Sequence, residues 1–116
     1  MRYREITTVG EWTEALERSS DKPLVVFKHS TQCPVSAGAL DEFSAYLDDH
    51  SGDNVDYVFV KVIESRPVSN RIAEDTGVTH ASPQLLYISG KSAGWHTSHW
   101  NITYSFLDEK LGASGQ

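Results

Sequence analysis

The sequence predicts an α/β fold in which helices cover both faces of a four-stranded mixed sheet. Helical patterns alternate with short apolar runs through residues 9–76, which is typical of strands joined by helices. The run at 24–28 shows little polar alternation, as expected for a central strand buried on both faces. Two later runs flank a glycine-containing loop and indicate an antiparallel hairpin. We expect one domain spanning residues 1–116.

The first helix is predicted over residues 9–18. Thr8 and Glu11 have the spacing of a capping box, in which each residue satisfies a backbone N–H of the other. Apolar side chains follow at helical spacing and give this helix one face that can pack against a sheet. A turn then leads to the first predicted strand, at 24–28.

The second helix is predicted to begin at Pro34, because proline suits the first turn of a helix, where its missing N–H has no partner to lose. The following apolar residues fall on one helical face: Leu40, Phe43 and Leu47. Small and polar residues at 51–54 break the chain. A second strand is predicted over 55–63, where bulky β-favouring residues gather.

The remaining elements are predicted from turn residues and apolar runs. Arg66 and Pro67 open a short helix, which Gly77 ends. After it we expect a strand at 84–88, a hairpin loop at 89–94, a returning strand at 95–100 and a final helix capped by Thr103. The aromatic residues of this region are expected to build core: Trp95, Trp100, Tyr104 and Phe106.

Composition excludes several classes of partner. The net charge is −6 and the ten lysines and arginines are scattered, which argues against binding to nucleic acid or to anionic membrane surfaces. No stretch approaches the length of a membrane span, so we expect a soluble, cytoplasmic protein. The five histidines and one cysteine lack zinc-site spacing, so no metal is expected.

The only cysteine, Cys33, is the candidate nucleophile. It directly precedes Pro34, where unpaired backbone N–H groups and the positive end of the helix dipole favour the thiolate. A buried, inert cysteine is the common alternative, but the polar residues at 29–32 indicate an exposed position. With no second cysteine in the chain, a mixed disulfide on Cys33 has to be resolved by an external thiol. The sequence therefore predicts a one-thiol redox site.

Two neighbours of Cys33 allow a functional and a structural interpretation. Ser36 lies one turn further along the predicted helix, so its hydroxyl could donate to the thiolate or simply be a first-turn serine. His29 could favour the thiolate if it is protonated and close, or it could point into the sheet and only pack.

Three segments carry a resemblance to known families. The pairs Ile72-Ala73, Gly77-Val78 and Pro83-Gln84 are arranged as in the segment of thioredoxins that carries the cis-proline. The segment KHSTQCPVS at 28–36, together with SPQ at 82–84 and SHWNIT at 98–103, is similar to the monothiol bacilliredoxins. These are redox proteins of the bacillithiol system.

The resemblance implies a thioredoxin-like fold and a thiol-disulfide oxidoreductase. In that family the cysteine attacks a mixed disulfide between bacillithiol and a protein, so Cys33 would take the bacillithiol and release the client protein reduced. Ser36 would occupy the place of the second cysteine of dithiol relatives. Pro83 would be the cis-proline, and we expect Ser82 and Pro83 beside Cys33. Bacillithiol would be a co-substrate, with S-thiolated proteins as partners and no cofactor.

The resemblance also suggests where the small thiol binds. The polar side chains of Thr31 and Gln32 suit a sugar-bearing thiol with hydroxyl and carboxylate groups, although solvated loop residues would look the same. Asn101 and Thr103 begin the last predicted helix, where such folds often hold an anionic group of the thiol. The plain N-cap is the preferred interpretation of Thr103.

Two other functions stay open from the sequence. Some monothiol relatives hold an iron–sulfur cluster between two subunits, each of which gives one cysteine. Pro34 departs from the Cys-Gly-Phe-Ser loop of those proteins. The other is a redox-sensing, stress-response protein in which a modified Cys33 changes the choice of partner.

Overall fold

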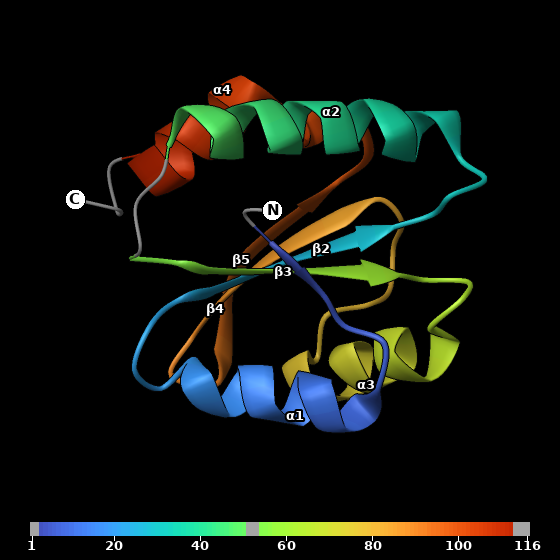
Figure 1. Ribbon diagram of the computed structural model, residues 1–116, viewed down its shortest axis with the longest axis vertical. Helices are drawn as coiled ribbons and strands as arrows, with labels where there is room; N and C mark the ends of the chain where they lie inside the picture. Colours follow the sequence, from blue (N-terminus) through green and yellow to red (C-terminus); the bar gives the residue numbers. More distant parts are fainter. Residues whose placement is uncertain (1–2, 51–53, 113–116) are drawn as a thin grey trace.

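The computed structural model describes residues 3–50 and 54–112 and places a five-stranded mixed sheet between two layers of helices (Figure 1). The strand order is β1-β3-β2-β4-β5. Helices α2 and α4 lie on one face of the sheet, and α1 and α3 lie on the other. In chain order the elements are β1 (Arg4–Glu5), α1 (Val9–Arg18), β2 (Leu24–His29), α2 (Pro34–Asp49), β3 (Asp56–Lys61), α3 (Arg66–Thr76), β4 (Gln84–Ser89), β5 (Ser92–Ser98), the 3₁₀ turn η1 (His99–Asn101), α4 (Tyr104–Leu107) and the π-helical segment η2 (Asp108–Gly112).

Strand β2 is the centre of the sheet. It pairs in parallel with β3 and antiparallel with β4, and all six of its residues are buried. Side chains of a strand alternate between its two faces. Leu24 and Val26 therefore join the core under α1 and α3, whereas Val25 and Phe27 join the core under α2. The central strand that the apolar run at 24–28 predicted is confirmed.

Helix α1 begins as the sequence predicted. The Thr8 hydroxyl accepts the backbone N–H of Glu11, and the Glu11 carboxylate accepts the N–H of Thr8, which completes the capping box. The buried Trp12 ties this helix to α3, because its indole N–H donates to Asp75 at 2.8 Å.

The sheet has five strands rather than the predicted four. The additional strand, β1, is two exposed residues long and lies at the sheet edge. Its two exposed residues pair with β3 through the backbone, so the sequence has no apolar pattern there that would predict a strand. In the part of the chain that the structure describes, no helix is long and apolar enough to span a bilayer. The predicted break at 51–54 lies largely outside the described residues.

The terminal hairpin differs from the prediction in its turn. Gly90 and Lys91 both have positive φ, which fits a two-residue turn whose twist matches the flanking strands, so β5 starts at Ser92 and the loop predicted at 89–94 does not form. The strand also ends earlier than predicted, because His99 adopts a positive φ and begins η1. As a result Trp100 is 76% exposed rather than core. The other aromatic residues of this region pack against the core as expected: Trp95, Tyr104 and Phe106.

Candidate functional site

Cys33 lies where β2 passes into α2. Its backbone is extended, at φ −113° and ψ 118°, and it forms the N-cap of the sixteen-residue helix that Pro34 begins. The Cys33 N–H donates to the Ser30 carbonyl at 3.3 Å, and its carbonyl accepts the Ala37 N–H at 3.1 Å. These two bonds fix the backbone on both sides of the sulfur. The residue is partly exposed, so its thiol can be reached from solvent.

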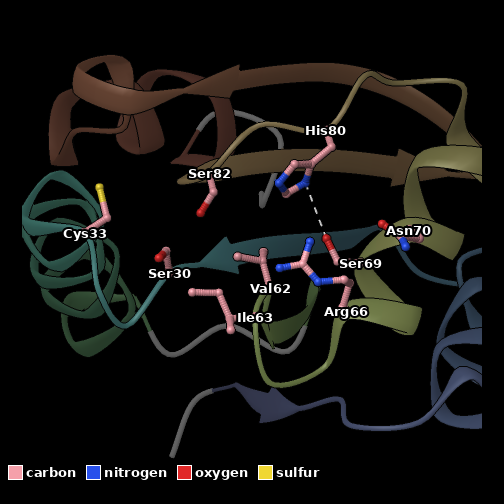
Figure 2. A pocket seen from close by; sticks show the side chains of 9 residues that line it. All are labelled: Ser30, Cys33, Val62, Ile63, Arg66, Ser69, Asn70, His80 and Ser82. Carbon is pink, nitrogen blue, oxygen red and sulfur yellow. Dashed lines mark hydrogen bonds between the residues drawn. The ribbon is translucent and has the colours of Figure 1, made fainter.

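Cys33 lies at the edge of a pocket of about 240 Å³ that the β2–α2 loop, the start of α3 and the segment before β4 line (Figure 2). Its lining residues are Ser30, Cys33, Val62, Ile63, Arg66, Ser69, Asn70, His80 and Ser82. The peptide bond between Ser82 and Pro83 is cis, as predicted. The structure therefore brings the cis-proline segment to the same pocket as Cys33.

The Ser36 hydroxyl bonds to groups beneath the site. Ser36 is fully buried and accepts the Ser30 N–H at 3.0 Å, while its oxygen lies 2.8 Å from the Nδ1 of His29. Among the described residues these are the hydrogen bonds of the hydroxyl, so Ser36 holds the loop that carries Cys33. This is the structural interpretation of Ser36, not a bond to the thiolate.

His29 packs inside the sheet. It is buried, and its ring lies against the rings of Phe27 and Phe59, with centroids 6.1 and 5.4 Å away. Burial lowers the pKa of His29 below its ordinary value of 6.5, so the ring is neutral at pH 7. The packing interpretation of His29 is therefore the one that the structure supports.

The loop before Cys33 is tied to the segment that precedes α3. The Thr31 hydroxyl donates to the Glu64 carboxylate at 3.0 Å. A backbone hydrogen bond of Glu64 and this bond from Thr31 lower the pKa of the Glu64 carboxyl. The side chain of Gln32 is exposed, and its backbone N–H donates to the Ser30 hydroxyl at 3.4 Å. Thr31 thus has a structural partner, while Gln32 faces solvent beside the site.

Asn101 and Thr103 do not line the Cys33 pocket. They line a different pocket, of about 430 Å³, with Trp100 and Phe106. The Thr103 hydroxyl accepts the N–H of Phe106 at 3.1 Å, which makes it a plain N-cap, and the helix it caps has only four residues. The structure gives Thr103 the capping role that the sequence also allowed, and thiol binding by Asn101 and Thr103 stays a prediction.

The structure adds basic residues that the sequence analysis did not single out. Arg66 and His80 line the Cys33 pocket, and Lys28 lies below it, completely buried in β2. The Lys28 ammonium donates to the Ser69 carbonyl at 3.3 Å, and burial lowers the pKa of Lys28 to about 8. The Ser69 hydroxyl in turn lies 3.3 Å from the Nδ1 of His80. In the sequence, the one sign of these basic residues was Lys28 at the end of the otherwise apolar run at 24–28.

Metal binding finds no support in the described residues. Within 3–50 and 54–112, no group of three or more His, Cys, Asp and Glu side chains is placed to hold a metal ion.

This chain is similar to a known protein family and to several solved structures. The family described as monothiol bacilliredoxin BrxC matches residues 4–107. A solved structure described as a candidate oxidoreductase with a thioredoxin fold is 30% identical, with a TM-score of 0.82, over 93% of this chain and 92% of that one.

Two thioredoxins share the fold at lower identity. That of Malassezia sympodialis is 16% identical, with a TM-score of 0.79, over 98% of this chain and 91% of its own. Thioredoxin NaTrxh of Nicotiana alata is 19% identical, with a TM-score of 0.78, over 99% and 94%. The thioredoxin-like fold that the resemblance implied is confirmed.

Proposed function

Because this chain belongs to the monothiol bacilliredoxin family of thiol-disulfide oxidoreductases, we propose that it removes bacillithiol from S-bacillithiolated proteins through a mixed disulfide on Cys33. One observation carries the proposal. The only cysteine of the chain caps α2, is partly exposed, and lies on the same pocket as the segment that leads to the cis-proline.

The first step transfers bacillithiol to the enzyme. The Cys33 thiolate attacks the bacillithiol sulfur of the client's mixed disulfide, a bond forms between these two sulfurs, and the client cysteine leaves as a thiolate. The client is thereby reduced by two electrons. The thiolate of a free bacillithiol then attacks the bacillithiol sulfur bound to Cys33. The bond between this sulfur and Cys33 breaks, Cys33 leaves as a thiolate, and the bacillithiol disulfide formed carries away the two-electron oxidation.

The surroundings of Cys33 support such a step. The α2 N-terminus places backbone N–H groups and a positive dipole end near the sulfur, which favours the thiolate. Ser36 and Thr31 hold the loop that presents Cys33. We assign Ser82 and Pro83 to the approach of the client chain, and Gln32 to the rim. The lone thiol suits a reducing compartment, and we propose that the chain acts in the cytoplasm as a single domain.

The test is a dethiolation assay read by intact mass. A client protein with one bacillithiolated cysteine is mixed with the enzyme and bacillithiol, and the adduct mass is followed on both proteins. We expect the adduct to leave the client, to appear transiently on Cys33, and to disappear as bacillithiol disulfide forms. Cys33→Ser should abolish the transfer while circular dichroism shows the same fold.

A matched control moves the thiol. The double variant Cys33→Ser, Ser105→Cys places a cysteine at an exposed position on the short helix α4. We expect this displaced thiol to dethiolate the client no faster than bacillithiol alone. Full activity in Cys33→Ser, or equal activity from the displaced thiol, would show that the proposed site is wrong.

A further inference from the structure

Two basic side chains line the Cys33 pocket. They are Arg66, at the first position of α3, and His80, in the segment before the cis-proline; no carboxylate is among the nine lining residues. Figure 2 shows the Arg66 and His80 side chains pointing toward the middle of the pocket, with Cys33 at one edge of it. The chain as a whole has a net charge of −6. The pocket thus has the opposite charge character from the rest of the protein.

Arg66 has no partner of its own for its charge. Among the described residues, its guanidinium makes no hydrogen bond and no ion pair with a carboxylate. Arg71, on the same helix, shows the usual arrangement, because it pairs with Asp75 at 3.3 Å. A guanidinium presents several N–H donors in a fork that matches a carboxylate. Arg66 keeps this fork available to a ligand.

Lys28 and His80 are two further basic groups at the same pocket. Lys28 is completely buried below the pocket, and its partner in the described structure is a carbonyl rather than a carboxylate. Burial, followed by the charges of Lys28 and Arg66, lowers the pKa of His80. The buried charge of Lys28 is costly without a counter-ion, and the charges of Lys28 and Arg66 disfavour protonation of His80. An anion in the pocket would relieve both effects.

The pocket also holds an unused hydrogen-bonding group. The hydroxyl of Ser82 is buried at the atom level and has no partner among the described residues. Buried hydroxyls are usually paired, so this one points to a ligand that completes it. Ser82 lies on the Cys33 side of the pocket, and the exposed residues Arg66 and His80 lie further from Cys33 (Figure 2).

We infer that this pocket binds a carboxylate of the low-molecular-weight thiol, with Arg66 and His80 as its partners, while the sulfur of that thiol reacts with Cys33. The inference rests on the proposed function and assigns the substrate class of the same site: thiols that carry a negative charge at a distance from sulfur. The pocket, at about 240 Å³, is smaller than the roughly 300–1,000 Å³ of drug-sized sites. It suits part of a small molecule, which favours the thiol over the client protein as the source of the carboxylate.

The experiment compares three symmetric disulfides of similar size. Dithiodipropionate carries carboxylates, bis(2-hydroxyethyl) disulfide is neutral and cystamine carries ammonium groups. The rate at which each modifies Cys33 of the full chain is measured by intact mass. We expect the wild-type rate to be highest for the carboxylate, relative to each reagent's rate with free cysteine. Arg66→Gln should lower the rate with the carboxylate, taken relative to the rate with the neutral disulfide, about three- to tenfold.

Controls separate the pocket from the protein's overall charge. Arg71→Gln removes the same charge from the same helix, away from the pocket, and should leave all three rates unchanged. His80→Gln should reduce the carboxylate preference as Arg66→Gln does. A bacillithiolated client with neutral flanks and one with acidic flanks should lose their adduct equally fast. A strong preference for the acidic client would instead assign the pocket to the client.

The outcomes also distinguish this inference from the proposed function. If Cys33 reacts readily with the neutral disulfide but shows no preference for the carboxylate, or if Arg66→Gln and Arg71→Gln behave alike, the carboxylate site is wrong and the exchange chemistry stands. If each disulfide modifies Cys33 no faster than it modifies free cysteine, the proposed function itself fails.

Discussion

Lys28→Met should stabilise the protein at neutral pH. Lys28 is completely buried in β2 and lacks a carboxylate partner among the described residues, so the folded state disfavours its charge. Burial lowers its pKa from the ordinary 10.5 to about 8. At about 1.36 kcal/mol per pKa unit, this difference corresponds to about 3 kcal/mol of lost stability when the side chain is charged. Methionine has a similar length and no charge, so it avoids this cost.

The lowered pKa of Lys28 also predicts how the stability difference changes with pH. Between about pH 8 and pH 10.5 the unfolded chain keeps the Lys28 proton and the folded chain does not, so the free energy of unfolding of the wild type rises with pH in this window. The advantage of the methionine variant should therefore be largest below about pH 8. It should shrink steadily above that pH.

Urea denaturation of both proteins at about pH 7 and about pH 9.5 measures the difference by linear extrapolation. The matched control is Lys61→Met on β3, where the side chain is partly exposed and lies 3.8 Å from Glu5; its effect should stay within about 0.5 kcal/mol. A destabilised Lys28→Met at pH 7, or a difference that is the same at both pH values, would refute the reasoning. Either result would mean that the buried ammonium has a compensating partner.

Three further predictions concern the loop, the buried histidine and the tryptophans. Ser36→Ala should lower the free energy of unfolding by about 1–3 kcal/mol in urea, because the partly buried Ser30 N–H loses its acceptor. The pKa of His29 is lowered by burial, so acid favours the unfolded chain below about pH 6.5, and His29→Phe should reduce the loss of stability between pH 6.5 and about pH 5. Trp12→Ala should cost about 3–5 kcal/mol and Trp100→Ala less than about 0.5 kcal/mol, both by thermal or urea unfolding.

Each of these predictions has an outcome that contradicts it. An unchanged Ser36→Ala would mean that water replaces the lost hydroxyl. The same acid sensitivity in His29→Phe would assign that sensitivity to another group, of which His80 is the first candidate because its pKa is also lowered by burial. Comparable effects of the two tryptophan substitutions would mean that the exposed indole packs against something in solution.

The sequence predicted the features that have a local cause. The apolar run of β2 and the Cys33–Pro34 pair located the strand, the helix start and the candidate thiol, since each depends on neighbours in the chain. The Gly77-to-Pro83 pattern located the cis-proline through the resemblance. These features follow from a handful of adjacent residues, so one sequence suffices to find them.

Features that depend on the tertiary structure were missed. Arg66 and His80 lie 14 positions apart, on a helix and a loop, and only the packing of α3 against the sheet brings them to one pocket. Trp100 was expected in the core from its residue type, but the positive φ of His99 turns the chain and leaves the indole exposed. No pattern within the sequence carries either fact.

The hydrogen bonds of Ser36 have a consequence for the evolution of this site. A cysteine at that position would supply a second sulfur, but it would replace the oxygen that accepts the Ser30 N–H and contacts His29 with a weaker acceptor. Conversion to a two-sulfur enzyme would thus loosen the loop that presents Cys33. With its single cysteine, the present enzyme has a turnover rate that depends on the concentration of free small thiol around it. The enzyme therefore slows when that thiol is oxidised.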